Sequence, residues 1–138
     1  MAKKAEVKEL RLEDFFTNTI NANGSKMFLM LNGEQTDRYL VVKGIDCKSA
    51  TRDRINTRNA LSLIDDQLKG MEESDLKTIE QNRLTDEAYK PLAIALVSGW
   101  SFDDFNTDNV KRIFDENEGL AFMVAAHASD QSNLQAKK

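Results

Sequence analysis

The chain has 138 residues, of which 41% are hydrophobic and 30% charged, and its formal net charge is −4 with a pI near 5.1. This length suits one domain with its own core, and we expect a single domain over residues 1–138. An acidic chain lacks long-range attraction for phosphate backbones and anionic lipid, so its charge disfavours nucleic-acid and membrane roles. The first residues lack the apolar segment of a secretory signal, and the longest apolar run, Leu92–Val97, is far shorter than a membrane span. The single cysteine, Cys47, fits a reducing compartment, and we therefore expect a cytoplasmic protein.

The N-terminal part predicts a β-hairpin within residues 25–46, preceded by a loose charged tail over residues 1–10. Two apolar segments, Met27–Leu31 and Tyr39–Val42, flank a polar connector that contains Gly33. The connector from Asn32 to Asp37 exceeds the two-residue optimum, so we expect a loop of about four to six residues. Because both segments are apolar at consecutive positions, we also expect both faces of the hairpin to be covered.

From Ser49 onward the apolar spacing is helical and predicts a helix over about residues 50–69. Residues 72–83 carry few apolar anchors and are either a helix or a solvated helical linker. Thr85 is a candidate cap for a further helix, which Gly99 closes and in which Pro91 fits only in the first turn or at a kink. Ser101 begins a segment with capping-box spacing.

Two more helices are expected from Thr107 and from Leu120. The fold class is thus α+β, with an N-terminal β-hairpin followed by a bundle of about four to five helices. The predicted helical part covers residues 50–134, and residues 135–138 are expected to be a flexible C-terminus.

No combination of residues in the sequence indicates catalysis. His127 is the only histidine, so no set of histidines, or of histidine with several cysteines, can hold a metal. Adjacent acidic pairs such as Asp103 and Asp104 point about 100° apart on a helix and chelate poorly. We therefore predict a protein that is not an enzyme and that uses no cofactor or metal, with His127 at a helix surface or an interface.

A basic stretch is the best argument for a nucleic-acid role. Arg54 and Arg58 share a helix face at spacing i, i+4, and Arg52 lies close by in the sequence. Asp53 interrupts the stretch and no aromatic residue interleaves with it, so a solvated basic face is favoured over a small nucleic-acid-binding regulator.

Aromatic residues are concentrated after Gly99. Trp100, Phe102 and Phe105 fall within six residues, which is more than a short connector between helices needs. They either fill the core or anchor a partner, and the two roles can divide among them. The candidate partner-binding residues are Trp100, Phe102, Phe105, Phe122, Met123 and His127.

The last third of the chain resembles the tail assembly chaperones of long-tailed bacteriophages. The resemblance is best over residues 92–138 and extends loosely to the hairpin. It rests on a helix that ends in Gly99-Trp100, an acidic segment, the helix Thr107–Phe114, a final helix, and the close Ala128–Leu134 before Lys137-Lys138. Two positions depart from the family pattern, since Glu118-Gly119 stands where a proline is common and Leu134 where a phenylalanine is frequent.

The resemblance implies a chaperone that binds the tape measure protein and promotes assembly of the tail tube protein around it. It also implies a frameshift-extended form of the same chain and a location in the host cell cytoplasm with absence from the mature virion. We further expect self-association into an open head-to-tail array, because linked weak contacts to an extended client give avidity. No nucleic-acid or membrane partner is implied. The alternative within the same viral setting is a structural virion component such as a head-tail connector.

Overall fold

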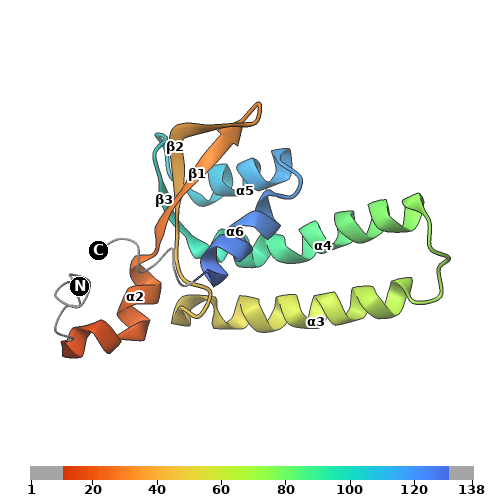
Figure 1. The fold of residues 1–138 in the computed structure, drawn as a ribbon, viewed down its shortest axis with the longest axis horizontal. Coiled ribbons are helices and arrows are strands. Elements are labelled where there is room, and N and C mark those ends of the chain that lie inside the picture. The colour runs from red at the N-terminus through yellow and green to blue at the C-terminus, as the bar shows by residue number, and fades with distance from the viewer. Residues whose placement is uncertain (1–10, 131–138) are drawn as a thin grey trace, which may run out of the picture.

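The computed structural model describes residues 11–130, which form a three-stranded antiparallel sheet and five α-helices (Figure 1). This confirms the predicted α+β class with predominant helix. The predicted tail 1–10, the C-terminal segment 135–138 and the last residues of the predicted helical part lie outside the described residues. In chain order the elements are the 3-10 helix η1 (Leu12–Phe15), α2 (Thr17–Asn23), β1 (Ser25–Leu31), β2 (Glu34–Val42), the 3-10 helix η2 (Lys48–Ala50), α3 (Thr51–Leu68), α4 (Asp75–Leu96), β3 (Val97–Trp100), α5 (Thr107–Glu116) and α6 (Leu120–Ser129).

The hairpin turn is shorter than the sequence suggested. Strands β1 and β2 are joined by Asn32 and Gly33 alone, which have φ values of 54° and 84°. Two positive φ values are the signature of a type I′ turn, for which Asn-Gly is the preferred pair. The predicted loop of four to six residues is therefore wrong, because the polar residues Glu34 to Asp37 continue strand β2 instead of forming a loop.

The pairing of β1 with β2 changes register near the tip of the hairpin. The shift lies between Phe28 and Met30, where the Thr36 hydroxyl donates a hydrogen bond of 2.7 Å to the carbonyl oxygen of Leu29. Such an irregularity bends the strand and changes which side chains face the core. As a result Phe28, Met30 and Leu31 are 39%, 54% and 66% exposed, so the expectation that both hairpin faces are covered is wrong here.

A third strand stands where the sequence predicted the end of a helix. Helix α4 ends at Leu96, and Val97–Trp100 pairs with β2 in the order β1-β2-β3, so Gly99 does not close the helix. Ser101 extends this pairing: its N–H donates to the Tyr39 carbonyl oxygen and its Oγ accepts from the Tyr39 N–H. The capping role expected at Ser101 belongs to Asn106, whose side chain accepts from the N–H of Asn109 at 2.9 Å.

Helices α3 and α4 form a long antiparallel pair whose far ends project beyond the rest of the molecule (Figure 1). Helix α3 confirms the predicted helix over residues 50–69. Helix α4 is one helix from Asp75 to Leu96 that begins at the cap Ser74, so the predicted start at Thr85 is wrong. Pro91 lies inside it, where packing of the helix against its neighbours offsets the lost backbone hydrogen bond.

The core lies between the sheet and helices α4, α5 and α6. Its most fully buried large side chains are Leu40 and Val42 of β2, Leu96 of α4, Phe114 of α5 and Val124 of α6. They come from the sheet and from three helices, so the sheet and the helices are stabilised by the same burial of apolar surface.

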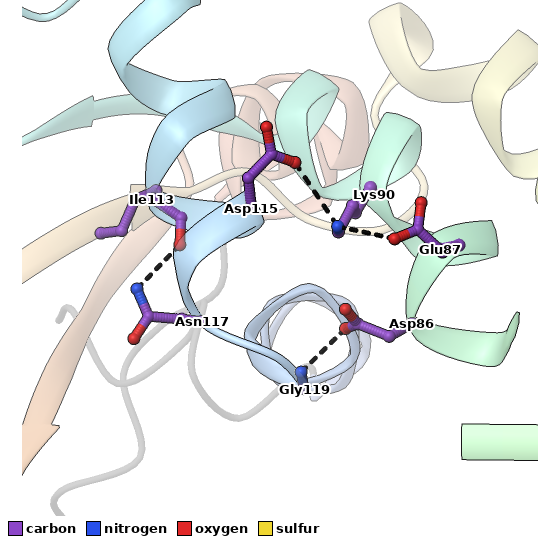
Figure 2. Close-up of polar contacts among 7 residues, drawn as sticks. All are labelled: Asp86, Glu87, Lys90, Ile113, Asp115, Asn117 and Gly119. Atoms are coloured by element: carbon purple, nitrogen blue, oxygen red, sulfur yellow. Dashed lines mark hydrogen bonds and ion pairs between the residues drawn. The ribbon is translucent and has the colours of Figure 1, made fainter. Parts of the chain in front are cut away.

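A buried carboxylate fixes the start of α6. Asp86, in the middle of α4, is only 6% exposed, and its Oδ1 accepts a hydrogen bond of 2.9 Å from the N–H of Gly119 (Figure 2). Gly119 is the N-cap residue of α6 and has a left-handed backbone, with φ 88°. The carboxylate thus accepts from the N–H of the cap residue, as a glutamate does in a capping box, and it lies at the positive end of the helix dipole.

Lys90 joins α5 to α4 beside this cap. Its Nζ lies 2.9 Å from the Glu87 carboxylate and 3.4 Å from that of Asp115 (Figure 2). These acceptors raise the pKa of Lys90, chiefly through the hydrogen bond that its ammonium group donates to Glu87.

The Asp86 cap leads to a stability prediction. Asp86→Ala leaves the N–H of the cap residue Gly119 without its acceptor and should lower the free energy of unfolding by about 1–2 kcal/mol in a urea titration. Asp86→Asn retains a side-chain oxygen and should lose less. Asp46→Ala, which changes an exposed aspartate outside the helices, is the control and should stay within about 0.5 kcal/mol of the wild type. Equal stability of Asp86→Ala and wild type would show that the cap is unimportant.

Candidate partner-binding surfaces

The six predicted partner-binding residues do not form one site. They fall at separate places: the end of β3 and the loop after it, two sides of α6, and the contact of α6 with the start of β1. That they bind a partner stays a prediction, but their geometry shows which of them a partner could reach.

The aromatic residues after Gly99 divide between the interior and the surface. Trp100 is half-buried, and the rings of Phe102 and Phe105 meet it edge-on with centroids 5.6 Å and 5.4 Å away. The two phenylalanines are 40% and 45% exposed. The Arg38 guanidinium lies 5.5 Å from the Phe102 ring centre, and this cation also covers part of the cluster. Trp100 therefore packs against the body, while Phe102 and Phe105 shield it and remain accessible.

Phe122 lies in a groove bounded by α3, α4 and α6, which we call the cationic groove. Its ring, 51% exposed, meets that of Tyr89 edge-on at 5.4 Å. The groove has a volume of about 430 Å³, and its walls are mostly apolar. The residues that line it are Ile45, Arg54, Thr57, Arg58, Leu61, Tyr89, Leu92, Phe122, Ala125, Ala126 and Ser129. Two arginines and no carboxylate are among them, so the groove is positively charged.

Met123 lies on the other side of α6, next to strand β1. Consecutive helical residues point about 100° apart, which explains why Phe122 and Met123 face different neighbours. Met123 is 49% exposed and, with Phe28 and Met30, lines a cavity of about 220 Å³ between β1 and α6. We call Phe28, Met30 and Met123 the hairpin surface. It is apolar, and β1 is an edge strand of the described sheet.

His127 makes a contact within the molecule. Its Nε2 lies 2.9 Å from the Ser25 hydroxyl, which joins α6 to the first residue of β1. The side chain is half-buried, and this burial lowers the pKa of His127, although the nearby Asp130 carboxylate acts in the opposite direction. The contact gives the residue a role in positioning α6 against the sheet.

The three arginines of the nucleic-acid alternative do not share one face. Arg52 and Arg54 are two residues apart on α3 and therefore point about 200° away from each other. The Arg54 guanidinium donates hydrogen bonds of 2.7 Å and 3.1 Å to the carbonyl oxygens of Ile45 and Cys47, so it is bound to the loop before α3. Only Arg58 is both exposed and on the groove side.

The hairpin surface was not predicted from the sequence. We expected Met27–Leu31 to be a strand covered on both faces, although alternate residues of a strand point to opposite sides. The long run of apolar residues was the available signal. Strand β3 pairs with β2, so no strand of the described chain pairs with the other edge of β1.

Within residues 11–130 no three or more histidine, cysteine, aspartate or glutamate side chains are grouped so as to hold a metal ion. No helix in this range combines the length and the apolar character needed to cross a membrane. Comparison of the chain with protein family models, with curated proteins and with solved structures finds no match.

The lowered pKa of His127 predicts a pH dependence of stability. The unfolded chain has the ordinary histidine pKa of 6.5, whereas the folded chain prefers the neutral ring. As the pH falls below 6.5 the unfolded state takes up the proton first, so the free energy of unfolding decreases; above 6.5 the contribution is fully present. Urea titrations at about pH 7.5 and about pH 5.5 should show this loss in the wild type.

His127→Gln is the control, because glutamine keeps a partner for Ser25 and does not titrate. The loss of stability between the two pH values should be smaller in this variant. An identical loss would assign the pH dependence to carboxylates elsewhere.

Proposed function

We propose that this protein is a non-enzymatic assembly chaperone that holds an extended, helix-rich client through the hairpin surface. The observation that carries the proposal is the exposure of three large apolar side chains that line one cavity, two of them on an edge strand. Contiguous exposed apolar surface on a soluble chain marks a site of interaction. The resemblance of residues 92–138 to tail assembly chaperones supports the choice of this class of binding protein.

The chemistry of the hairpin surface suits a client with a variable sequence. Met30 and Met123 have flexible, polarisable side chains that adapt to different apolar partners. The Phe28 ring meets Tyr39 edge-on at 5.6 Å and gives the surface one rigid member. Such a surface binds the apolar stripe of an amphipathic helix without requiring one particular residue pattern.

In this proposal the client is the tape measure protein of a long-tailed bacteriophage. The chaperone keeps it soluble and extended in the host cytoplasm, promotes polymerisation of the tail tube protein around it, and leaves before the virion is mature. Copies of the chain, including a frameshift-extended form, associate along the client, since many weak contacts linked together give high avidity. A head-tail connector, by contrast, would be present in purified mature particles.

The hairpin surface gives a binding prediction. Met30→Gln with Met123→Gln should weaken binding to a purified helical fragment of the tape measure protein about tenfold, because both apolar anchors are lost. Fluorescence anisotropy of the labelled fragment measures the affinity, and suppression of the light scattering of the longer client measures chaperone activity.

Leu63→Gln is the matched control. Leu63 on α3 is 67% exposed, compared with 54% for Met30, but it lies outside the hairpin surface. This variant should bind the fragment like the wild type. The proposal fails if the wild-type chain does not bind the fragment, and the assignment of the surface fails if Leu63→Gln weakens binding as much as the double variant.

A further inference from the structure

We propose that the acidic tip of the α3–α4 pair of one copy docks into the cationic groove of a second copy. This inference rests on the self-association in the proposed function and assigns its two faces. The acidic tip is defined as residues 65–75, the end of α3, the loop and the first residue of α4.

The acidic tip combines negative charge with exposed apolar side chains. It has five acidic residues and one lysine, and its Met71 is 42% exposed. Leu76, one residue beyond it, is 75% exposed. In the described chain one carboxylate of the tip, that of Glu73, is neutralised in an ion pair, with Lys77 at 2.7 Å. The tip projects beyond the other elements, so it is free to enter a concave surface (Figure 1).

The cationic groove has the complementary character. Its walls offer the Phe122 and Tyr89 rings to an apolar side chain, and its two charged members are both arginines. Arg54 donates to neutral carbonyl groups, and no ion pair joins Arg58 to a carboxylate in the part of the chain that the structure describes. Methionine or leucine surrounded by carboxylates is therefore the kind of group that this groove would bind.

The charge pattern of α3 works against the stability of the helix itself. Arg52 and Arg54 lie in its first turn, at the positive end of the helix dipole, while Asp65 and Asp66 lie in its last turn, at the negative end. Asp53 and Lys69 only partly correct this arrangement. Charges that oppose the helix dipole do not stabilise α3 in an isolated copy. When two copies lie head to tail, the acidic end of α3 in one copy comes close to the basic start of α3 in the other.

The two charged regions cannot neutralise each other within one copy. Arg54 and Asp66 are twelve residues apart on one continuous helix, which is about 18 Å along its axis. This exceeds the screening length of about 8–10 Å at physiological ionic strength. The acidic tip also cannot fold back onto the groove of its own copy, because the α3 residues that line the groove lie between Arg54 and Leu61 and the tip is at the far end of the same helix. The occupant of the groove is therefore the acidic tip of another copy, and such a contact joins two different faces and can continue along a row of copies.

Charge reversal tests the docking directly in sedimentation velocity. Arg58→Glu in the groove and Glu72→Lys in the tip should each weaken self-association of the full chain about tenfold. Mixing the two variants should restore association, because the altered tip then meets the altered groove and the unaltered tip meets the unaltered groove. Raising the salt to about 0.5 M should weaken wild-type association by screening the same charges.

Asp66→Lys separates docking from a structural role. It replaces a charge that opposes the dipole of α3, so the melting temperature should rise while self-association weakens. A residue with only a structural role would not change the two quantities in opposite directions.

Arg112→Glu and Glu116→Lys on α5 are matched controls outside the two surfaces, and both should associate like the wild type. The inference is overturned if the wild-type chain stays monomeric at high concentration, if the controls weaken association as much as the test variants, or if mixing restores nothing. Binding of the tape measure fragment by the monomeric variants judges the proposed function separately, since the hairpin surface is intact in them.

Discussion

The pairing of β2 with β3 is the interaction on which the arrangement of the molecule depends. Leu40, Val41 and Val42 of β2 oppose Trp100, Gly99 and Val97 of β3, so segments about sixty residues apart in the sequence become neighbours. The N–H of Lys43 also donates to the carbonyl oxygen of Leu96 at 2.8 Å, which ties the end of α4 to the end of the hairpin. Without this pairing the sheet would consist of the two-stranded hairpin alone, and the hairpin would have no fixed position relative to the helices.

Helix α6 contributes side chains to two different surfaces. It lies against α4, and its start is held by the buried Asp86 carboxylate while its later part contacts β1 through His127 and Ser25. Because neighbouring residues of a helix point in different directions, Phe122 contributes to the cationic groove and Met123 to the hairpin surface. One short helix thus contributes to both of the surfaces that we propose for a client and for a second copy of the chain.

The α3–α4 pair is longer than the body that covers it. Ile79, Asp86 and Ala93 repeat every seven residues and share one face of α4, yet Asp86 and Ala93 are buried whereas Ile79 is 62% exposed. Helix α6 covers this face near Asp86, and the described chain has no element over the earlier turns. The projecting part is stabilised by contact between the two helices and by surface ion pairs such as Glu80 with Arg83, each a weak interaction.

The sequence by itself determined the elements whose signals are local. The apolar spacing predicted α3, α5 and α6 near their observed bounds, and the α+β class followed from a hairpin ahead of helices. The tight turn at Asn32-Gly33 was also readable, but the polar residues of β2 that follow were assigned to a loop. A strand with one solvent-exposed face also contains such polar residues. Whether they form a strand or a loop depends on whether a neighbouring strand pairs with them.

Only the tertiary structure decided what depends on distant partners. Strand β3 is four residues long and forms because β2 offers it an edge, and α4 continues through Thr85 and Pro91 because α3 and α6 pack against it. For the same reason Trp100 is half-buried while Phe102 and Phe105 are exposed. Phe122 and Met123 likewise belong to different surfaces. The sequence specifies the chemical type of each side chain, but its exposure to solvent depends on which distant residues pack beside it.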